Sequence, residues 1–251
     1  MISRKILICC GLALILNLRA NSIDDFIKDF NNDDTIDNIE EVCAEINENN
    51  AQAVLNAMCY LMVRPGKFMR DPRGEIYAER DRLAGKVAQR AIECGANANA
   101  KINNQFYPSL LLIAVGNGGF KIAEILANAD ADMNCVDIHG WTAFYRAVYL
   151  NSNLESRVSA IKAMLVRGAN PNYIPPYSPR RSALYFAVVR KDYDLVEILL
   201  SFGANPDMFL GKSNGMRVDG SSFSYCSVSE YVKNKGDERM MDIFNRFFKY
   251  P

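Results

Sequence analysis

The sequence predicts an all-α protein, a solenoid of about five helix pairs stacked side by side. One observation is a short phrase of small and amide-bearing residues that occurs at 95–99, 130–134, 168–172 and 203–207. Its copies begin 35, 38 and 35 residues apart. The other observation is that apolar residues precede every copy at three- and four-residue spacing, which is the period of one buried helix face. A unit that recurs in this way buries its apolar face against its neighbours.

Each helix pair is predicted to begin at a capping hydroxyl. The clearest copy of the first half of the unit is 137–148, Asp-Ile-His-Gly-Trp-Thr-Ala-Phe-Tyr-Arg-Ala-Val, with partial copies at 109–115 and 182–188. In these copies Thr142, Ser109 and Ser182 stand where a side-chain oxygen accepts an orphan backbone N–H of the first helix. Gly140 permits the turn that precedes Thr142.

The second helix of each pair is predicted to end in a left-handed residue. Gly95, Gly168 and Gly203 begin three of the four recurring phrases, and glycine adopts positive φ without steric cost. Asp130 takes this place in the remaining copy, and aspartate tolerates the conformation better than most residues.

With these two phrases the chain resembles the ankyrin repeat. That family has a D-x-x-G-x-T-P-L-H-x-A-A turn and first helix, followed by a second helix that ends in G-A-D-x-N. The resemblance covers roughly residues 80–250. It departs from the family at the proline and histidine positions of the three copies, which hold Leu110, Ala143 and Ala183, and Leu112, Tyr145 and Tyr185. The resemblance implies a monomeric, non-enzymatic protein without cofactors that binds another protein.

The first segment, 1–22, is predicted to be a secretory signal peptide. Arg4 and Lys5 precede an apolar run over 6–16, and Ala20 and Ser22 offer small residues at a cleavage site. The eleven apolar residues are too few to span a bilayer, which needs about 20. We therefore expect a secreted or periplasmic protein with no membrane insertion after cleavage. An uncleaved membrane anchor is the alternative.

The rest of the chain is divided into a capping region and a repeat domain. Residues 23–50 are an acidic N-terminal capping helix region, with ten acids and one lysine over 24–48. Residues 51–251 form the repeat domain. Within it, 51–99 is a degenerate first repeat with an inserted loop at 64–78, and 100–134, 135–172, 173–207 and the terminal 208–251 follow. The alternative for the N-terminal part is an independent helical hairpin.

Composition and charge exclude some classes of function. Apolar residues make up 49% and charged residues 23% of the 251, the balance of a globular protein. The 29 basic and 29 acidic residues form no basic stripe, which argues against nucleic-acid binding. Five cysteines follow the signal peptide, an odd number without C-x-x-C spacing, so we predict no zinc site and leave disulfides open. They are Cys43, Cys59, Cys94, Cys135 and Cys226.

No catalytic constellation is found. A Ser-His-Asp or Cys-His arrangement would have to use His139, the only histidine, and no G-x-S-x-G sequence accompanies it. We predict no catalytic residue, no metal site and no cofactor.

The candidate binding site comes from the resemblance. In ankyrin repeats the turn that precedes each first helix is called the finger, and the positions that vary on the fingers and first helices usually contact partners. It consists of Asn117, Ile138, His139, Trp141, Tyr149, Tyr177, Arg181 and Arg190. Trp141 is the only tryptophan, and Trp, Tyr and Arg are over-represented at interface hot spots. Alternatively Trp141 packs on the next finger, and His139 is a solvated turn residue. Tyr107, Tyr173 and Arg180 extend the aromatic and basic mixture along neighbouring fingers.

Three rival functions remain open at this point. One is a secreted, host-directed effector of the same fold. Another is a ligand-binding or enzymatic protein that builds a pocket from the insertions at 64–78 or 208–225. The third is a structural stabiliser within a larger assembly.

Overall fold

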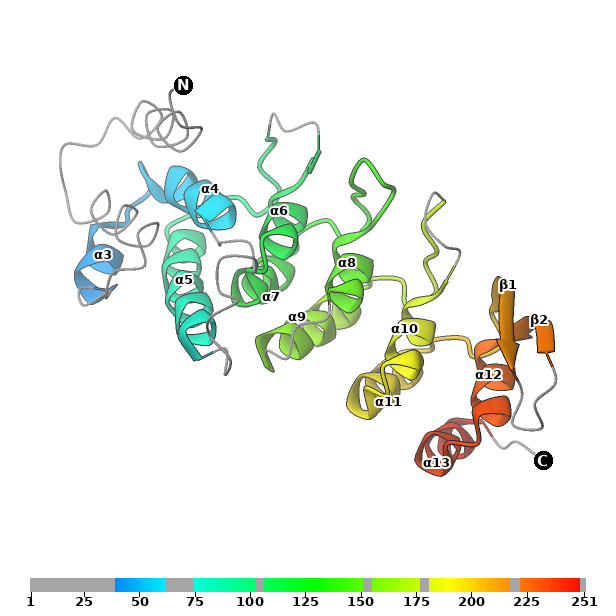
Figure 1. Ribbon diagram of the computed structural model, residues 1–251. Coiled ribbons are helices and arrows are strands. Elements are labelled where there is room, and N and C mark those ends of the chain that lie inside the picture. Colours follow the sequence, from blue (N-terminus) through cyan, green and yellow to red (C-terminus); the bar gives the residue numbers. More distant parts are fainter. Residues whose placement is uncertain are drawn as a thin grey trace, which may run out of the picture.

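The computed structural model describes residues 39–61, 75–102, 106–150, 155–176, 181–216 and 222–248. Side chains at 61, 75–76 and 209–226 are outside this description, as are residues 1–38 with the expected signal peptide. The described residues form eleven helices that lie in two rows (Figure 1). The prediction of an all-α solenoid is confirmed.

The inner row consists of α4 (Ala51–Leu61), α6 (Leu110–Gly116), α8 (Ala143–Tyr149), α10 (Ala183–Val189) and α12 (Val228–Lys235). The outer row consists of α3 (Ile39–Glu45), α5 (Glu75–Glu93), α7 (Phe120–Asn128), α9 (Glu155–Val166), α11 (Tyr193–Ser201) and α13 (Glu238–Phe247). Each inner helix packs on the inner helices before and after it and on the outer helix that follows it in the chain. The fingers project beyond one end of the inner row (Figure 1).

One continuous core runs between the two rows. Phe120, Phe144 and Tyr145 are among its largest fully buried side chains. Small residues recur where inner helices lie against each other, since Ala114, Ala147 and Ala187 are at most 1% exposed. Because each repeat completes the apolar surface of the next, the stack is held mainly by contacts between neighbours.

The predicted helix starts are present in the structure. The hydroxyl oxygens of Ser109, Thr142 and Ser182 each accept a backbone N–H three residues on, at 3.2 Å in all three helices. Losing such a cap costs about 1 kcal/mol.

The predicted left-handed turns are also present. Gly95, Gly168 and Gly203 have φ of 93°, 91° and 81°, and Asp130 has φ of 57°. Beyond each turn an asparagine or aspartate oxygen accepts the N–H two residues on, as Asn170 does from Asn172 at 2.9 Å. This local hydrogen bond explains why the amide-bearing phrase recurs.

The N-terminal helices extend the same pattern. Helix α3 packs on α5 in the outer row. After it, Asn47 Oδ1 accepts the N–H of Asn49 at 3.0 Å, as Asn97 does from Asn99 at 2.8 Å. Helix α3 therefore occupies the place of an outer helix, and the turn at 47–49 is a further copy of the phrase, one that is not among the four predicted. Most of the loop predicted at 64–78 lies outside the described residues, and α5 begins at Glu75.

The last finger contains two strands that the sequence analysis does not predict. Strand β1 (Phe209–Met216) pairs antiparallel with β2 (Ser222–Ser227), with two register irregularities. Glycine and serine weaken the alternation of apolar and polar residues that would mark a strand. Pairing across the turn therefore decides the structure of this segment.

Four of the five cysteines can be placed. Cys43, Cys59, Cys94 and Cys135 are free thiols, while the side chain of Cys226 lies outside the description. The described residues of the stack therefore contain no disulfide.

A buried carboxylate on α5 caps the start of α7. Gly119, the N-cap residue, has no side chain to offer, and Asp81 accepts the backbone N–H of Lys121 at 3.0 and 3.1 Å. Asp81 is 1% exposed. Burial raises the pKa of this carboxyl to about 6, although hydrogen bonds from Ser156 and Lys121 act in the opposite direction.

We expect Asp81 to make the protein less stable as the pH rises. Its folded pKa of about 6 lies above the ordinary 3.8, so the folded state holds the proton more tightly. This contribution is complete below the ordinary pKa and is lost as the pH rises through the folded one, by roughly 2–3 kcal/mol. Urea unfolding of wild type and Asp81→Asn between about pH 4 and 7 measures it. Equal pH slopes for the two proteins would assign the effect to another group.

Candidate functional site

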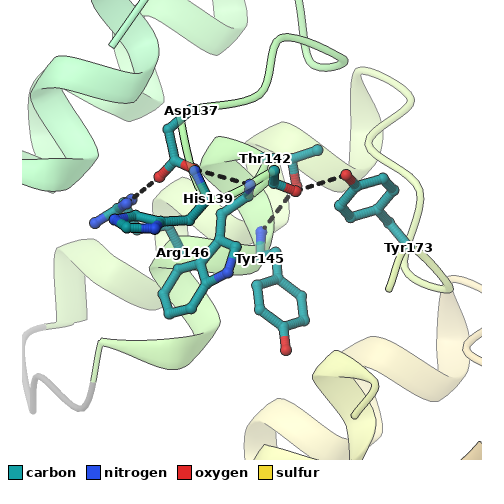
Figure 2. Close-up of polar contacts among 8 residues, drawn as sticks. Asp137, His139, Thr142, Tyr145, Arg146 and Tyr173 are labelled. Atoms are coloured by element: carbon teal, nitrogen blue, oxygen red, sulfur yellow. Dashed lines mark hydrogen bonds and ion pairs between the residues drawn. The ribbon is translucent and has the colours of Figure 1, made fainter. Parts of the chain in front are cut away.

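The finger at 135–142 is organised around one buried carboxylate (Figure 2). Asp137 accepts the backbone N–H groups of His139 and Trp141 at 2.8 and 2.9 Å, and its Oδ2 pairs with Arg146. Its side chain is fully buried, and that of Arg146 is only 13% exposed. The N–H of Asp137 donates in turn to the carbonyl of Trp141 at 3.0 Å, which closes the turn. The finger is therefore fixed to α8 through its own side chains.

The same contacts fix the tryptophan ring. The Arg146 guanidinium lies over the rings of Trp141 and Tyr107, 5.2 Å from each centroid. Trp141 is half-buried. The indole therefore packs against the Arg146 guanidinium, which Asp137 holds in place, and only part of the indole is exposed to solvent.

A row of aromatic side chains continues along α8 and onto α10. Trp141 lies 5.5 Å from Tyr145 and 4.7 Å from Tyr149 between ring centroids, both edge to face. Tyr149 lies 5.3 Å from Phe186 of the next inner helix. Edge-to-face pairs at such distances are the favoured geometry. Tyr149 is 39% exposed and Phe186 is half-buried, so part of the row faces outward.

Basic side chains lie on these rings and on those of the next repeat. The Arg190 guanidinium is 5.8 and 5.5 Å from the ring centroids of Tyr149 and Phe186. The arrangement recurs at Arg181, just before α10, whose guanidinium is 4.7 Å from the ring centroid of Tyr185, and on α12 of the following repeat, where Lys235 is 5.7 Å from that of Tyr231. We call the set Trp141, Tyr149, Tyr185, Phe186, Tyr231, Arg181, Arg190 and Lys235 the aromatic surface.

Hydrogen bonds between neighbouring repeats hold the fingers in register. The Tyr173 hydroxyl donates to the carbonyl of Gly140 at 2.6 Å, and the Tyr145 hydroxyl donates to that of Arg181 at 2.9 Å. The first bond joins the finger at 135–142 to the finger of the next repeat, and the second joins α8 to that same next finger (Figure 2 labels the tyrosines). The aromatic surface thus lies on repeats whose relative positions are fixed by hydrogen bonds.

Comparison with known proteins agrees with the repeat geometry. The family model of the ankyrin repeat matches residues 180–209, which contain α10, α11 and the turn after them. A protein of fowlpox virus (strain NVSL), named as an ankyrin repeat protein, is 32% identical over 88 residues. This chain is an ankyrin-repeat protein. The viral match covers 35% of this chain and only 18% of its relative, so it compares a short part of a much longer protein.

Ankyrin repeats generally mediate interactions between proteins, and the family is typically non-enzymatic. Among the described residues, no group of three or more histidine, cysteine, aspartate or glutamate side chains could hold a metal ion. No helix within the same residues is long and apolar enough to cross a membrane.

The ankyrin stack brings several of the predicted site residues together. Trp141, Tyr149, Arg181 and Arg190 belong to the aromatic surface. His139 lies beside it, with its ring centroid 6.3 Å from that of Trp141. Trp141 packs on its own helix α8, against Tyr145 and Arg146.

Ile138 and Tyr177, also predicted, are not among the residues of the aromatic surface. Ile138 is at the finger tip, 52% exposed, where its N–H donates to the carbonyl of Phe106 on the preceding finger at 3.4 Å. Tyr177 and Arg180 lie outside the described residues.

Asn117 and Arg190 occupy the same position of two repeats and have a structural task. Asn117 Nδ2 donates to the carbonyl of Cys59 at 3.0 Å, at the end of the preceding inner helix. Arg190 donates to the carbonyls of Val148 and Tyr149 at 2.8 and 2.7 Å. Each side chain thus satisfies carbonyls that its neighbouring helix leaves without a partner.

Several residues that form or support the aromatic surface were not predicted as site residues: Tyr145, Arg146, Tyr185, Phe186, Tyr231 and Lys235. A signal was available, because residues 141, 145 and 149 are aromatic at four-residue spacing and so share one face of α8. The contact of Phe186 with Tyr149 had no such signal, since it depends on how two repeats stack.

Proposed function

We propose that this ankyrin-repeat protein is a binding module that holds a partner protein on the aromatic surface. The observation that carries the proposal is the row of Trp141, Tyr149 and Phe186, whose rings contact one another and are partly exposed. Large rings already held in place lose little conformational entropy on binding, and such residues dominate interface energies. The helical stack supplies the rigid support.

The test compares capture of a partner by matched variants. The full chain is immobilised and exposed to extract and secreted material of the source organism. We expect Tyr149→Ala to lose a captured protein that wild type retains, with the affinity falling roughly 30-fold. Val166→Ala on the outer helix α9, 67% exposed, is the control and should capture as wild type does.

Thermal unfolding separates lost binding from lost structure. Because Tyr149 is partly exposed, its replacement is expected to lower the Tm by only a few degrees. Trp141→Ala is a less clean variant, since it also removes the ring that stacks on Arg146. If Tyr149→Ala captures the same proteins with wild-type affinity, the aromatic surface is not the binding face.

We also propose that the protein is exported and cleaved after Ser22. The support is the order of basic, apolar and small residues in 1–22. In the source organism, mass spectrometry is expected to find a mature chain that begins at Ile23, outside the cytoplasm. Leu14→Arg interrupts the apolar run and should leave uncleaved protein inside the cell. An intact chain in the membrane fraction would instead indicate an uncleaved anchor.

A further inference from the structure

The charge of the inner helices departs from that of the whole chain. The sequence has equal numbers of acidic and basic residues. Helices α8, α10 and α12, however, contain one acid, Glu230, and three bases, Arg146, Lys233 and Lys235. Arg181 and Arg190 flank α10 and add two further positive charges. These helices and the residues that flank α10 therefore carry more bases than acids, an excess that the count over the whole chain does not show; we call this part of the inner row the strip.

Three carboxylates near this strip, all on aspartates, already pair with other cations. Asp137 pairs with Arg146, Asp192 pairs with Arg157 at 2.9 Å, and Asp237 pairs with Lys191 at 2.9 Å. Among the described residues no carboxylate pairs with Arg181, Arg190 or Lys235, and each of these cations lies over an aromatic ring instead. The strip therefore has cations without anionic partners.

The geometry of these cations leaves them able to bind an anion. A guanidinium that stacks on a ring uses its face, while the N–H groups at its edge remain available for a carboxylate. Arg181 is arranged in this way over Tyr185. Burial and the nearby Arg157 lower the pKa of Arg190, so an incoming negative charge would relieve a cation that its surroundings destabilise.

We propose that the partner presents an acidic segment, a stretch of Asp and Glu with interspersed apolar residues, to the aromatic surface. This inference rests on the proposed function and names the chemistry of the partner. Carboxylates pair with Arg181, Arg190 and Lys235, and apolar side chains contact the exposed parts of Tyr149 and Phe186. The carbonyls of Val148 and Tyr149 keep Arg190 in place while it does so.

The experiment uses a phage-displayed library of random peptides without tryptophan, selected on the full chain. The selected pool is expected to be rich in Asp and Glu. The best peptide is then synthesised and titrated against the protein, with emission followed from Trp141, the single tryptophan in the chain. Replacing its acids by Asn and Gln should weaken binding about tenfold, and raising the salt from about 50 to about 500 mM should weaken it as well.

Two matched pairs of substitutions test which cations of the protein bind the acidic peptide. Arg181→Gln with Lys235→Gln is expected to weaken the acidic peptide about tenfold, because two partly exposed pairs are lost. Lys162→Gln with Arg167→Gln removes the same charge from α9 and the turn after it, and should bind as wild type does.

Two results would overturn the inference: a selected pool without an excess of acids, or equal affinity for the Arg181→Gln, Lys235→Gln protein. The proposed function is judged separately by Tyr149→Ala and its captured partner. If that variant loses its partner while the peptides show no acidic preference, only the inference about charge fails.

Discussion

Replacing Asp137 by alanine is expected to destabilise the protein more than any other single change in the finger, by roughly 3–5 kcal/mol. The change leaves Arg146 in a site where its side chain is 13% exposed, without a counter-ion. It also removes the acceptor of the His139 and Trp141 N–H groups. Urea unfolding of the purified variants gives the loss in free energy.

A double-mutant cycle tests this assignment. Asp137→Asn keeps an acceptor for the two N–H groups but loses the charge, and should cost about 2 kcal/mol. Arg146→Met removes the cation and leaves Asp137 with two N–H donors. The double variant, Asp137→Asn with Arg146→Met, is expected to be more stable than the sum of the two single losses predicts. The reason is that neither charge of the ion pair is left without its partner. Additive losses would show that the ion pair does not link the finger to α8.

This dependence has a functional consequence. Arg146 is the group on which Trp141 stacks, and Asp137 positions Arg146. Loss of Asp137 is therefore expected to weaken partner binding even at temperatures where the stack remains folded. The core alanine at 147 and the cap at Thr142 support the repeat, whereas Asp137 supports the surface that the repeat presents.

The sequence predicted those features that depend on local interactions. The caps at Ser109, Thr142 and Ser182 are decided within one turn of helix, and the left-handed Asp130 is decided by the turn it occupies. A periodic pattern with such local rules is sufficient to predict stacked helix pairs.

The features that the sequence did not predict depend on contacts between residues that lie apart in the sequence. Asn117 and Arg190 are predicted as contact residues, and the sequence does not show that both side chains also bond to carbonyls of the preceding inner helix. Phe186 was missed because its place beside Tyr149 depends on the stacking of α10 on α8. Strands β1 and β2 were missed because strand pairing joins residues that are separate in the sequence.

Gly118 is a position where a single methyl group is expected to have a large effect. It lies between α6 and α7 with φ of +85°, and the Tyr77 hydroxyl donates to its carbonyl at 2.6 Å. A Cβ at this glycine would lie 1.9 Å from the Tyr77 oxygen. Tyr77 itself is only 9% exposed, so it has little room to move.

Gly118→Ala is therefore expected to cost about 3 kcal/mol, the sum of roughly 1–2 for the left-handed backbone and roughly 1–3 for the clash. Gly203→Ala is the matched control, because φ there is +81° and nothing lies within 4 Å of the added Cβ. That variant should show only the backbone cost. In a Tyr77→Phe background the clashing oxygen is absent and the ring carbon Cζ lies 3.2 Å from the added Cβ, so most of the excess cost of Gly118→Ala over Gly203→Ala should disappear. Equal losses for the two glycines in the wild-type background would mean that Tyr77 moves away freely, and that its hydrogen bond does not hold α5 against the turn between α6 and α7.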